Sequence, residues 1–168
     1  MPNMDIDTLK SNLTNPARGY LWRILCANPL GGSSDLWMFR GQSASLPDRS
    51  IGDIVMNYMA TGGVVYPGKL KYSHNWDVTL KEGEDRASFK AMYEWSNKVV
   101  SDVTGLGSIS IKTDFYLQLL NVDGTVALKI KLSGCYPKNM PNVALSQDDE
   151  GAYMYATTIN FDKWEVAD

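Results

Sequence analysis

Apolar and polar residues alternate along several stretches of the chain, and this pattern predicts β-strands. In residues 74–81, Trp76, Val78 and Leu80 point to one side and polar residues to the other, which is typical of a half-buried strand. Residues 153–161 alternate in the same way near the C-terminus. Both stretches are expected to lay an apolar face on a core.

Two further apolar runs, residues 20–27 and 36–43, are interpreted as strands. Residues 28–35 between them contain one proline and two glycines, which break regular structure and favour a turn. The two runs are therefore predicted to pair as a hairpin. A short strand is also expected at residues 143–146.

The strongest hairpin signal is Asp123-Gly124, which separates the apolar runs 112–120 and 125–133. A two-residue turn there would bring Leu119 opposite Leu128, Leu117 opposite Ile130 and Phe115 opposite Leu132. On the other face it would bring Gln118 opposite Lys129, Tyr116 opposite Lys131 and Asp114 opposite Ser133. A slip of one residue would mix the two faces, so this register is well specified.

Residues 84–101 predict the one long helix. An apolar stripe at helical spacing comprises Phe89, Met92, Tyr93, Ser96, Val99 and Val100. Acidic residues at 82–85 suit the positive end of the helix dipole, and the glycines of residues 104–108 would end the helix. Glu94 and Lys98 are spaced for an ion pair on its polar face.

Residues 45–73 are rich in glycine and proline but also contain β-prone runs. A structureless segment of this length is uncommon inside a compact domain. We therefore predict a projecting hairpin with its tip near residues 61–63. Its many apolar residues would be a liability on a monomer, which indicates a contact with other molecules.

Composition agrees with one globular β-rich domain. The chain has 168 residues, of which 44% are hydrophobic and 21% charged, and these values exclude disorder, collagen and a coiled coil. A net charge of −3 disfavours a nucleic-acid-binding domain. Residues 1–19 are interpreted as an irregular N-terminal arm and residues 20–168 as the domain. No signal peptide, membrane span or membrane anchor is expected.

The residues of catalytic and metal chemistry are sparse. His74 is the one histidine, and no Gly-x-Ser-x-Gly motif accompanies it. Cys26 and Cys135 are far apart and read as reduced, buried thiols. The sequence therefore predicts no catalytic residue, no metal site and no cofactor, and favours a binding or structural protein over an enzyme.

Several short motifs, taken together and in order, carry a family resemblance. They are residues 39–47 (FRGQSASLP), residues 76–80 (WDVTL), the acidic turn 82–85 before a helix with Phe89 and Trp95, and residues 131–139 (KLSGCYPKN). Over roughly residues 20–165 this arrangement resembles the tail tube family of contractile-tail bacteriophages. The type VI secretion tube subunit is a more distant relative.

The resemblance implies a mainly β fold, a sandwich or barrel of about seven or eight antiparallel strands with one outer helix. Six subunits would close into a ring around a composite barrel, and rings would stack into a tube inside a sheath. Implied partners are further copies of the chain, the sheath protein, baseplate or tube initiator and terminator proteins, and a tape measure protein in the lumen. Double-stranded DNA would pass through without specific binding. The implied location is a virion tail, assembled in the bacterial host cytoplasm.

Three surfaces follow as hypotheses from this resemblance. The inter-ring surface would comprise Leu46, Pro47, Ile51, Ile54, Val55, Tyr58, Val65 and Tyr66. The lumen-facing surface would comprise Asp114, Tyr116, Gln118, Lys129 and Lys131. The alternative, that Lys129 and Lys131 are simply solvated surface lysines, fits the sequence nearly as well. The sheath-facing surface would comprise Lys90, Glu94 and Lys98.

The member type stays open between a main tube protein, a tube-initiating paralogue and the inner tube of an injection device. A type VI-like carrier of effectors is the first alternative. A monomeric β-barrel that binds a small ligand is the second.

Overall fold

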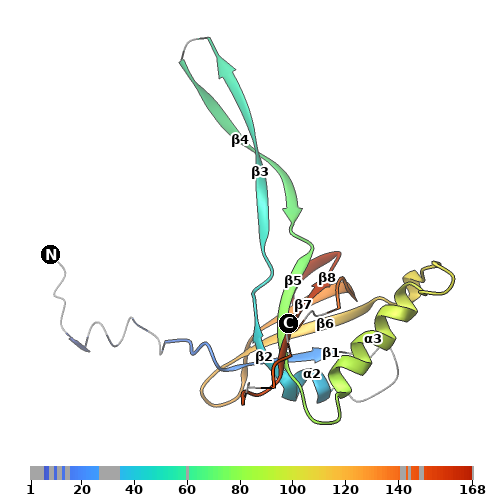
Figure 1. Ribbon diagram of the computed structural model, residues 1–168. Helices are drawn as coiled ribbons and strands as arrows, with labels where there is room; N and C mark the ends of the chain where they lie inside the picture. Colours follow the sequence, from blue (N-terminus) through green and yellow to red (C-terminus); the bar gives the residue numbers. More distant parts are fainter. Residues whose placement is uncertain are drawn as a thin grey trace.

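The computed structural model describes residues 6–7, 10, 13, 16–26, 35–59, 61–140, 143, 145–147 and 150–167 (Figure 1). Of the predicted turn at residues 28–35, residues 28–34 lie outside the described residues. In chain order the elements are β1 (Trp22–Cys26), α2 (Asp35–Arg40), β2 (Gly41–Ala44), β3 (Arg49–Tyr58), β4 (Thr61–Tyr72), β5 (Asn75–Lys81), α3 (Ala87–Val99), the 3₁₀ turn η1 (Ile109–Ile111), β6 (Thr113–Leu120), β7 (Val126–Pro137), β8 (Met154–Asn160) and β9 (Lys163–Ala167).

The strands form two antiparallel layers that share β7. The N-terminal half of β7 lies between β6 and β9, and β6 pairs in turn with β1. The C-terminal end of β7 pairs with β8, which continues into β5 and β2. The mainly β, sandwich-like fold predicted above is confirmed, and the sheets of one chain do not close into a barrel. β9 is a strand that the prediction did not separate from the end of the chain.

The β6–β7 hairpin has the predicted register over its central pairs, from Phe115 opposite Leu132 to Leu119 opposite Leu128. Its end differs, because Asn121 N–H donates to the carbonyl of Thr125 at 2.8 Å. Gly124, with φ of 83°, therefore sits in a longer turn with a left-handed residue, and a register shift at Leu119 and Leu120 compensates. A second register shift, between Thr113 and Phe115, interrupts the pairing at Asp114.

Large side chains fill the space between the layers. The fully buried ones include Ile24, Trp76, Val78, Leu80, Phe115, Leu117, Leu132, Tyr155, Ile159 and Phe161. Trp37 of α2 meets Phe115 edge-on at 4.9 Å between ring centroids, and Trp95 of α3 stacks on Phe115 at 6.0 Å. The two helices thus contribute aromatic rings to the same core.

The predicted strand at residues 36–43 is wrong for its first half. Residues 36–40 belong to α2, with Asp35 in its first turn and Arg40 in its last, as the helix dipole favours. β2 follows and pairs with β5, whereas β1 pairs with β6, so the predicted hairpin between the two runs is also wrong. The helical turn is favoured because it buries Trp37 against Phe115.

The helix at residues 84–101 is confirmed as α3, but its buried stripe is displaced. Ser88, Met92 and Trp95 are buried, whereas Phe89 and Tyr93 are 38% and 48% exposed. The Trp95 indole N–H donates to the carbonyl of Ile111 at 3.1 Å, and this bond helps to set which face of the helix turns inward.

Smaller differences concern turns. Residues 134–137 extend β7 instead of starting a turn, and Val143, Leu145 and Ser146 lie outside any strand. The projecting hairpin turns just before β4 begins at Thr61, slightly ahead of the predicted tip.

Candidate functional site

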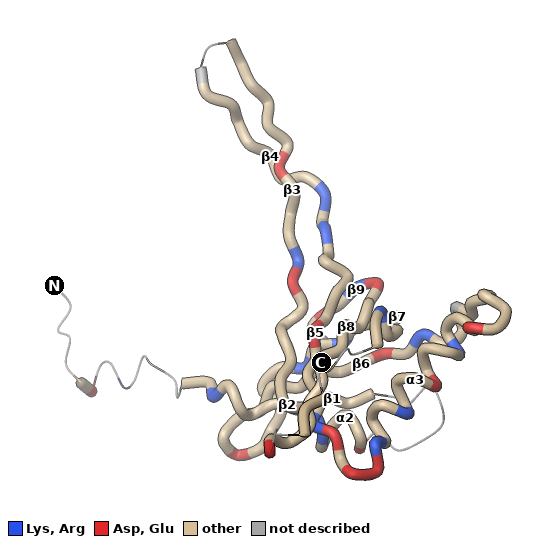
Figure 2. The backbone as a smooth tube through the Cα atoms, viewed as in Figure 1, with Lys and Arg blue, Asp and Glu red and all other residues tan. Residues whose placement is uncertain are grey.

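The most prominent surface feature is the hairpin of β3 and β4, which extends far from the sandwich (Figure 1). Its charged residues are confined to the half nearer the body, at Arg49, Asp53, Lys69 and Lys71, and residues 54–66 contain none (Figure 2). The predicted projecting hairpin is confirmed. Its outer half combines exposure to water with an uncharged sequence.

Most of the residues predicted for the inter-ring surface lie on this hairpin. Ile51, Ile54, Val55, Tyr58, Val65 and Tyr66 are between 49% and 71% exposed. Leu46 and Pro47 precede β3 and lie on the body instead. Leu46 borders an apolar groove beside the β6–β7 turn, and Pro47 is buried at the hairpin base.

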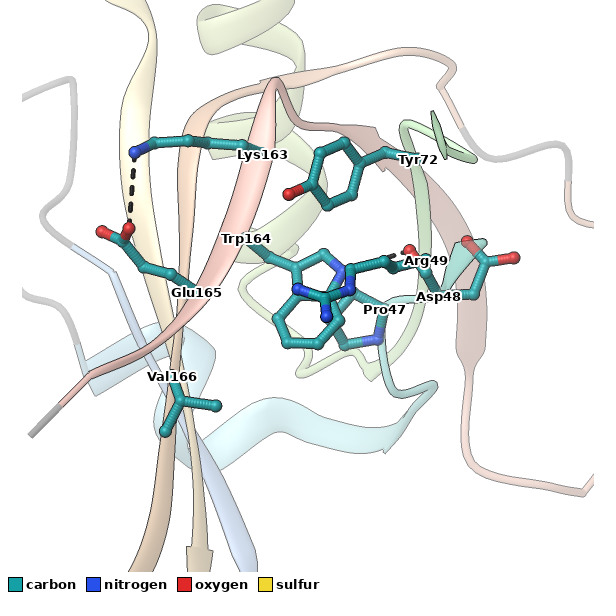
Figure 3. Close-up of a pocket in the computed structure, with 8 residues that line it drawn as sticks. All are labelled: Pro47, Asp48, Arg49, Tyr72, Lys163, Trp164, Glu165 and Val166. Atoms are coloured by element: carbon teal, nitrogen blue, oxygen red, sulfur yellow. Dashed lines mark hydrogen bonds and ion pairs between the residues drawn. The ribbon is translucent and has the colours of Figure 1, made fainter. Parts of the chain in front are cut away.

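The hairpin base is attached to the C-terminal strand (Figure 3). The Trp164 indole N–H donates to the carbonyl of Asp48 at 3.0 Å, and the Arg49 guanidinium lies 5.7 Å from the Trp164 ring centroid. The Asp48 carboxylate accepts from the backbone N–H of Ser73 at 3.3 Å, which links the two strands at the base. Sequence analysis missed this cluster, because nothing local connects β9 with a segment over a hundred residues earlier.

A surface pocket of about 860 Å³ opens beside this base. It is lined by Pro47, Asp48, Arg49, Tyr72, Lys163, Trp164, Glu165 and Val166. Figure 3 shows Lys163 paired with Glu165 on one side of the pocket and Arg49 against Trp164 on the other. The pocket lies where the hairpin joins the sandwich, and charged side chains of both signs border it.

The residues predicted for the lumen come together on the outer face of β6 and β7. Lys131 forms an ion pair with Asp114 at 3.0 Å, and this hydrogen bond raises the pKa of Lys131. Lys129 lies over the Tyr116 ring at 5.0 Å. Gln118 is buried, at 7% exposure, and accepts from Arg23 Nε at 2.6 Å.

Sequence analysis missed three residues of the same face: Arg23 of β1 and Lys163 and Glu165 of β9. Their places depend on β1 and β9 pairing with β6 and β7. With them the face carries four cationic side chains and two carboxylates, so the acidic balance of the whole chain does not extend to it.

The residues predicted for the sheath contact, Lys90, Glu94 and Lys98, are all exposed on α3. Lys90 Nζ donates to the carbonyl of Asp85 at 3.1 Å. Glu94 and Lys98 are not among the ion pairs of the described residues, so their predicted pairing is not observed. Phe89 and Tyr93 are exposed on the same helix, so its outer surface is mixed in character.

The start of α3 is held by a buried ion pair. The Glu82 side chain is fully buried, pairs with Arg40, and accepts from the backbone N–H groups of Ser88 and Phe89 at 3.2 and 2.8 Å. Asp85 accepts from Arg40 at 2.8 Å, and this bond lowers the pKa of Asp85. Arg40 therefore joins the end of α2 to the beginning of α3.

The histidine and the two cysteines have structural positions. His74 Nδ1 donates to the carbonyl of Phe161 at 2.9 Å. Cys26 and Cys135 are buried, and burial raises the pKa of each thiol to about 12. Within the described residues no group of His, Cys, Asp or Glu is arranged to hold a metal ion, and no helix is long and apolar enough to span a membrane.

No family profile and no curated protein matches the sequence. Solved structures do match the fold. The sheath/tube terminator of an extracellular contractile injection system has a TM-score of 0.71 at 15% identity, covering 93% of this chain and 99% of that one. A chain from the sheath-tube complex of an extracellular contractile injection system has a TM-score of 0.68 at 14% identity, covering 90% and 91%.

A third structure, Hcp1 from Flavobacterium johnsoniae, has a TM-score of 0.53 at 12% identity, covering 88% of this chain and 94% of that one. At such identities the likeness establishes the fold. The chain has the fold of tube-related proteins of contractile injection systems, as the resemblance in its sequence implied.

Proposed function

We propose that this protein is a structural subunit of the tube of a contractile tail or injection device. Six copies close into a ring, and rings stack into a hollow tube within a sheath. The protein performs no catalysis in this role. The observation that carries the proposal is the uncharged, exposed outer half of the β3–β4 hairpin, together with the shared fold.

The hairpin supports axial stacking. A two-stranded hairpin is marginal in water by itself, and this one exposes apolar side chains along its outer half. Contiguous exposed apolar surface of this kind marks an interaction site. Contact with the next ring would cover it.

The sheet edges support ring closure. Among the described strands, β1 pairs with β6 alone and β9 with β7 alone, which leaves one edge of each unpaired. Unpaired edges promote pairing with another chain, and closed assemblies remove them. A β1 edge joined to the β9 edge of the next copy would continue the β1-β6-β7-β9 sheet around a ring.

In this assembly the outer face of β6 and β7 lines the channel, and α3 faces the sheath. The partners would be the sheath protein, baseplate or tube initiator and terminator proteins, and a tape measure protein. In a virion tail, double-stranded DNA would pass through the channel. The likeness to a terminator makes a place at the end of the tube an alternative to a place along it.

Electron microscopy of the purified chain tests the proposal. We expect rings or hollow rods, and a variant in which residues 52–63 are replaced by a two-residue turn should give rings that do not stack. Charge reversal at Lys90 and Lys98 should leave tubes intact and weaken sheath assembly. A monomer at all concentrations, or rods of normal length from the shortened variant, would refute the assignment.

An injection device that carries proteins is the second candidate. The outer face of β6 and β7 has more cations than carboxylates, and such a face suits an acidic protein cargo. Co-purification of assembled tubes with acidic proteins instead of DNA would favour this candidate. A small-ligand carrier is disfavoured, because side chains fill the space between the sheets.

A further inference from the structure

A mainly apolar groove of about 680 Å³ lies beside the turn between β6 and β7, bordered by residues 16–19 of the N-terminal arm and by the body. We propose that this groove receives the tip of the β3–β4 hairpin of a second copy of the chain. The inference rests on the proposed function and names the acceptor surface for the stacking contact.

The groove is mainly apolar. Leu117 at its floor is 2% exposed, whereas Leu46 and Val122 at its rim are 61% and 60% exposed. Arg18 and Asp123 are the charged side chains of its lining, and they carry opposite signs. A groove of this kind suits an uncharged apolar occupant, since an unpaired charge inside it would be costly.

The hairpin tip has the matching chemistry. Ile54 lies opposite Tyr66, and the next pair, Val55 opposite Val65, points to the other face of the ribbon. Both faces are therefore apolar, and no charged residue occurs between positions 54 and 66. Met59 at the tip is 86% exposed. A groove that encloses the tip would cover both faces, whereas a flat surface would cover one.

The sizes agree. A cavity of about 150 Å³ holds one benzene-sized group, so the groove has room for about four such side chains. The tip presents a comparable set in Met56, Tyr58, Met59 and Val64, all more than half exposed.

The positions of the two surfaces require two copies. The hairpin tip lies at one end of the molecule, and the β6–β7 turn that borders the groove lies at the other (Figure 1). A chain cannot reach its own groove with its own tip. A contact between two different surfaces of identical copies can be repeated indefinitely, unless the rotation from one copy to the next closes the assembly into a ring. Repetition along one axis gives a stack.

Cross-linking of the full-length chain tests this contact. The variant Met59→Cys with Val122→Cys places one thiol on the tip and one on the groove rim, while the native cysteines stay buried. Treated with a short bis-maleimide under assembly conditions, this variant should give a ladder of dimers, trimers and longer chains. Each single variant should give at most a dimer band.

The matched control pairs Met59→Cys with Val103→Cys, because Val103 is 89% exposed and lies outside the groove. It should give no ladder. A ladder of equal strength from the control, or tubes without a ladder from the groove variant, would overturn the inference and leave the proposed function standing. Absence of both tubes and ladder would overturn both.

A second variant tests the groove without cross-linking. Leu46→Asp places a charge on an exposed rim position, so the fold should be retained. Stacking should then require at least tenfold more protein than for the parent or for Val103→Asp, and unchanged stacking would contradict the inference.

Discussion

The indole N–H of Trp164 donates to the backbone carbonyl of Asp48 at 3.0 Å, although 116 residues separate them in the sequence. Trp164 belongs to β9, whose outer edge is unpaired among the described strands, and Asp48 immediately precedes β3. One side chain thus connects the edge proposed for ring closure to the base of the hairpin proposed for stacking.

Replacing Trp164 with Phe should loosen the hairpin base without unfolding the sandwich. The change keeps an aromatic ring and removes one hydrogen bond, which contributes about 1 kcal/mol. We expect faster hydrogen exchange in residues 48–50 and 71–73, with the β6–β7 hairpin unaffected. The control is Glu165→Gln, which breaks an exposed ion pair next to it. Equal exchange in Trp164→Phe and the parent would show that the bond does not hold the base.

Replacing Arg40 with Met should destabilise the protein by about 3 kcal/mol, measured by urea unfolding. The fully buried Glu82 carboxylate would lose its ionic partner, and an unpaired buried charge is strongly destabilising. Asp85→Asn removes the exposed partner of the same arginine and should cost much less stability, because solvent screens an exposed ion pair. Similar losses in the two variants would contradict the distinction between the two ion pairs.

Stability should fall between about pH 9 and pH 12. Burial raises the pKa of Cys26 and of Cys135 from 9.0 to about 12, so the folded thiols keep their protons where unfolded thiols lose theirs. The unfolded state then binds fewer protons, and stability falls with rising pH by up to about 1.4 kcal/mol per pH unit for each thiol.

The double variant Cys26→Ala with Cys135→Ala isolates this effect from other alkaline titrations. Its unfolding free energy should decline less steeply above pH 9 than that of the parent, although it starts lower because of the lost packing. Parallel declines in the two proteins would exclude the thiols as the cause.

Assembled tubes should bind DNA more strongly when Asp114 is replaced by Asn. Lys131 is now paired with Asp114, and the variant would free its charge for a phosphate contact. We expect more co-sedimentation of a short duplex at low salt and a steeper loss with added salt. Glu94→Gln removes a charge from α3 and serves as the control. Equal gains in both variants would place the β6–β7 face outside the channel.

Local patterns predicted the elements whose partners are close in sequence. The β6–β7 register follows from alternation on both sides of Asp123-Gly124, because a slip would expose Phe115 and Leu117. The β3–β4 hairpin follows from β-prone runs around glycines. The helix α3 was predicted, but its inner face only in part. Met92 is buried as predicted, whereas Phe89 and Trp95 lie on neighbouring stripes and only packing selects between them.

The same distinction between local and long-range contacts separates the candidate surface residues that were predicted from those that were missed. The outer half of the hairpin and the polar side of β6 and β7 were predicted, since each lies within one local unit. Arg23, Arg40 and Trp164 were missed, because their roles depend on contacts with Gln118, Glu82 and Asp48, which lie at least 42 residues away.

The order of residues therefore specified most of the strands, the β3–β4 and β6–β7 hairpins, the absence of charge from the outer half of the β3–β4 hairpin and the resemblance to tube proteins. Three-dimensional packing decided that residues 36–40 coil into α2, that β1 joins β6 while β9 joins β7, and that Leu46 borders a groove. Short-range periodicity determines which face of an element is apolar, but the energy of burying that face depends on what it meets. Trp37 is the clearest case, because its helix is favoured by Phe115, a residue 78 positions further along the chain.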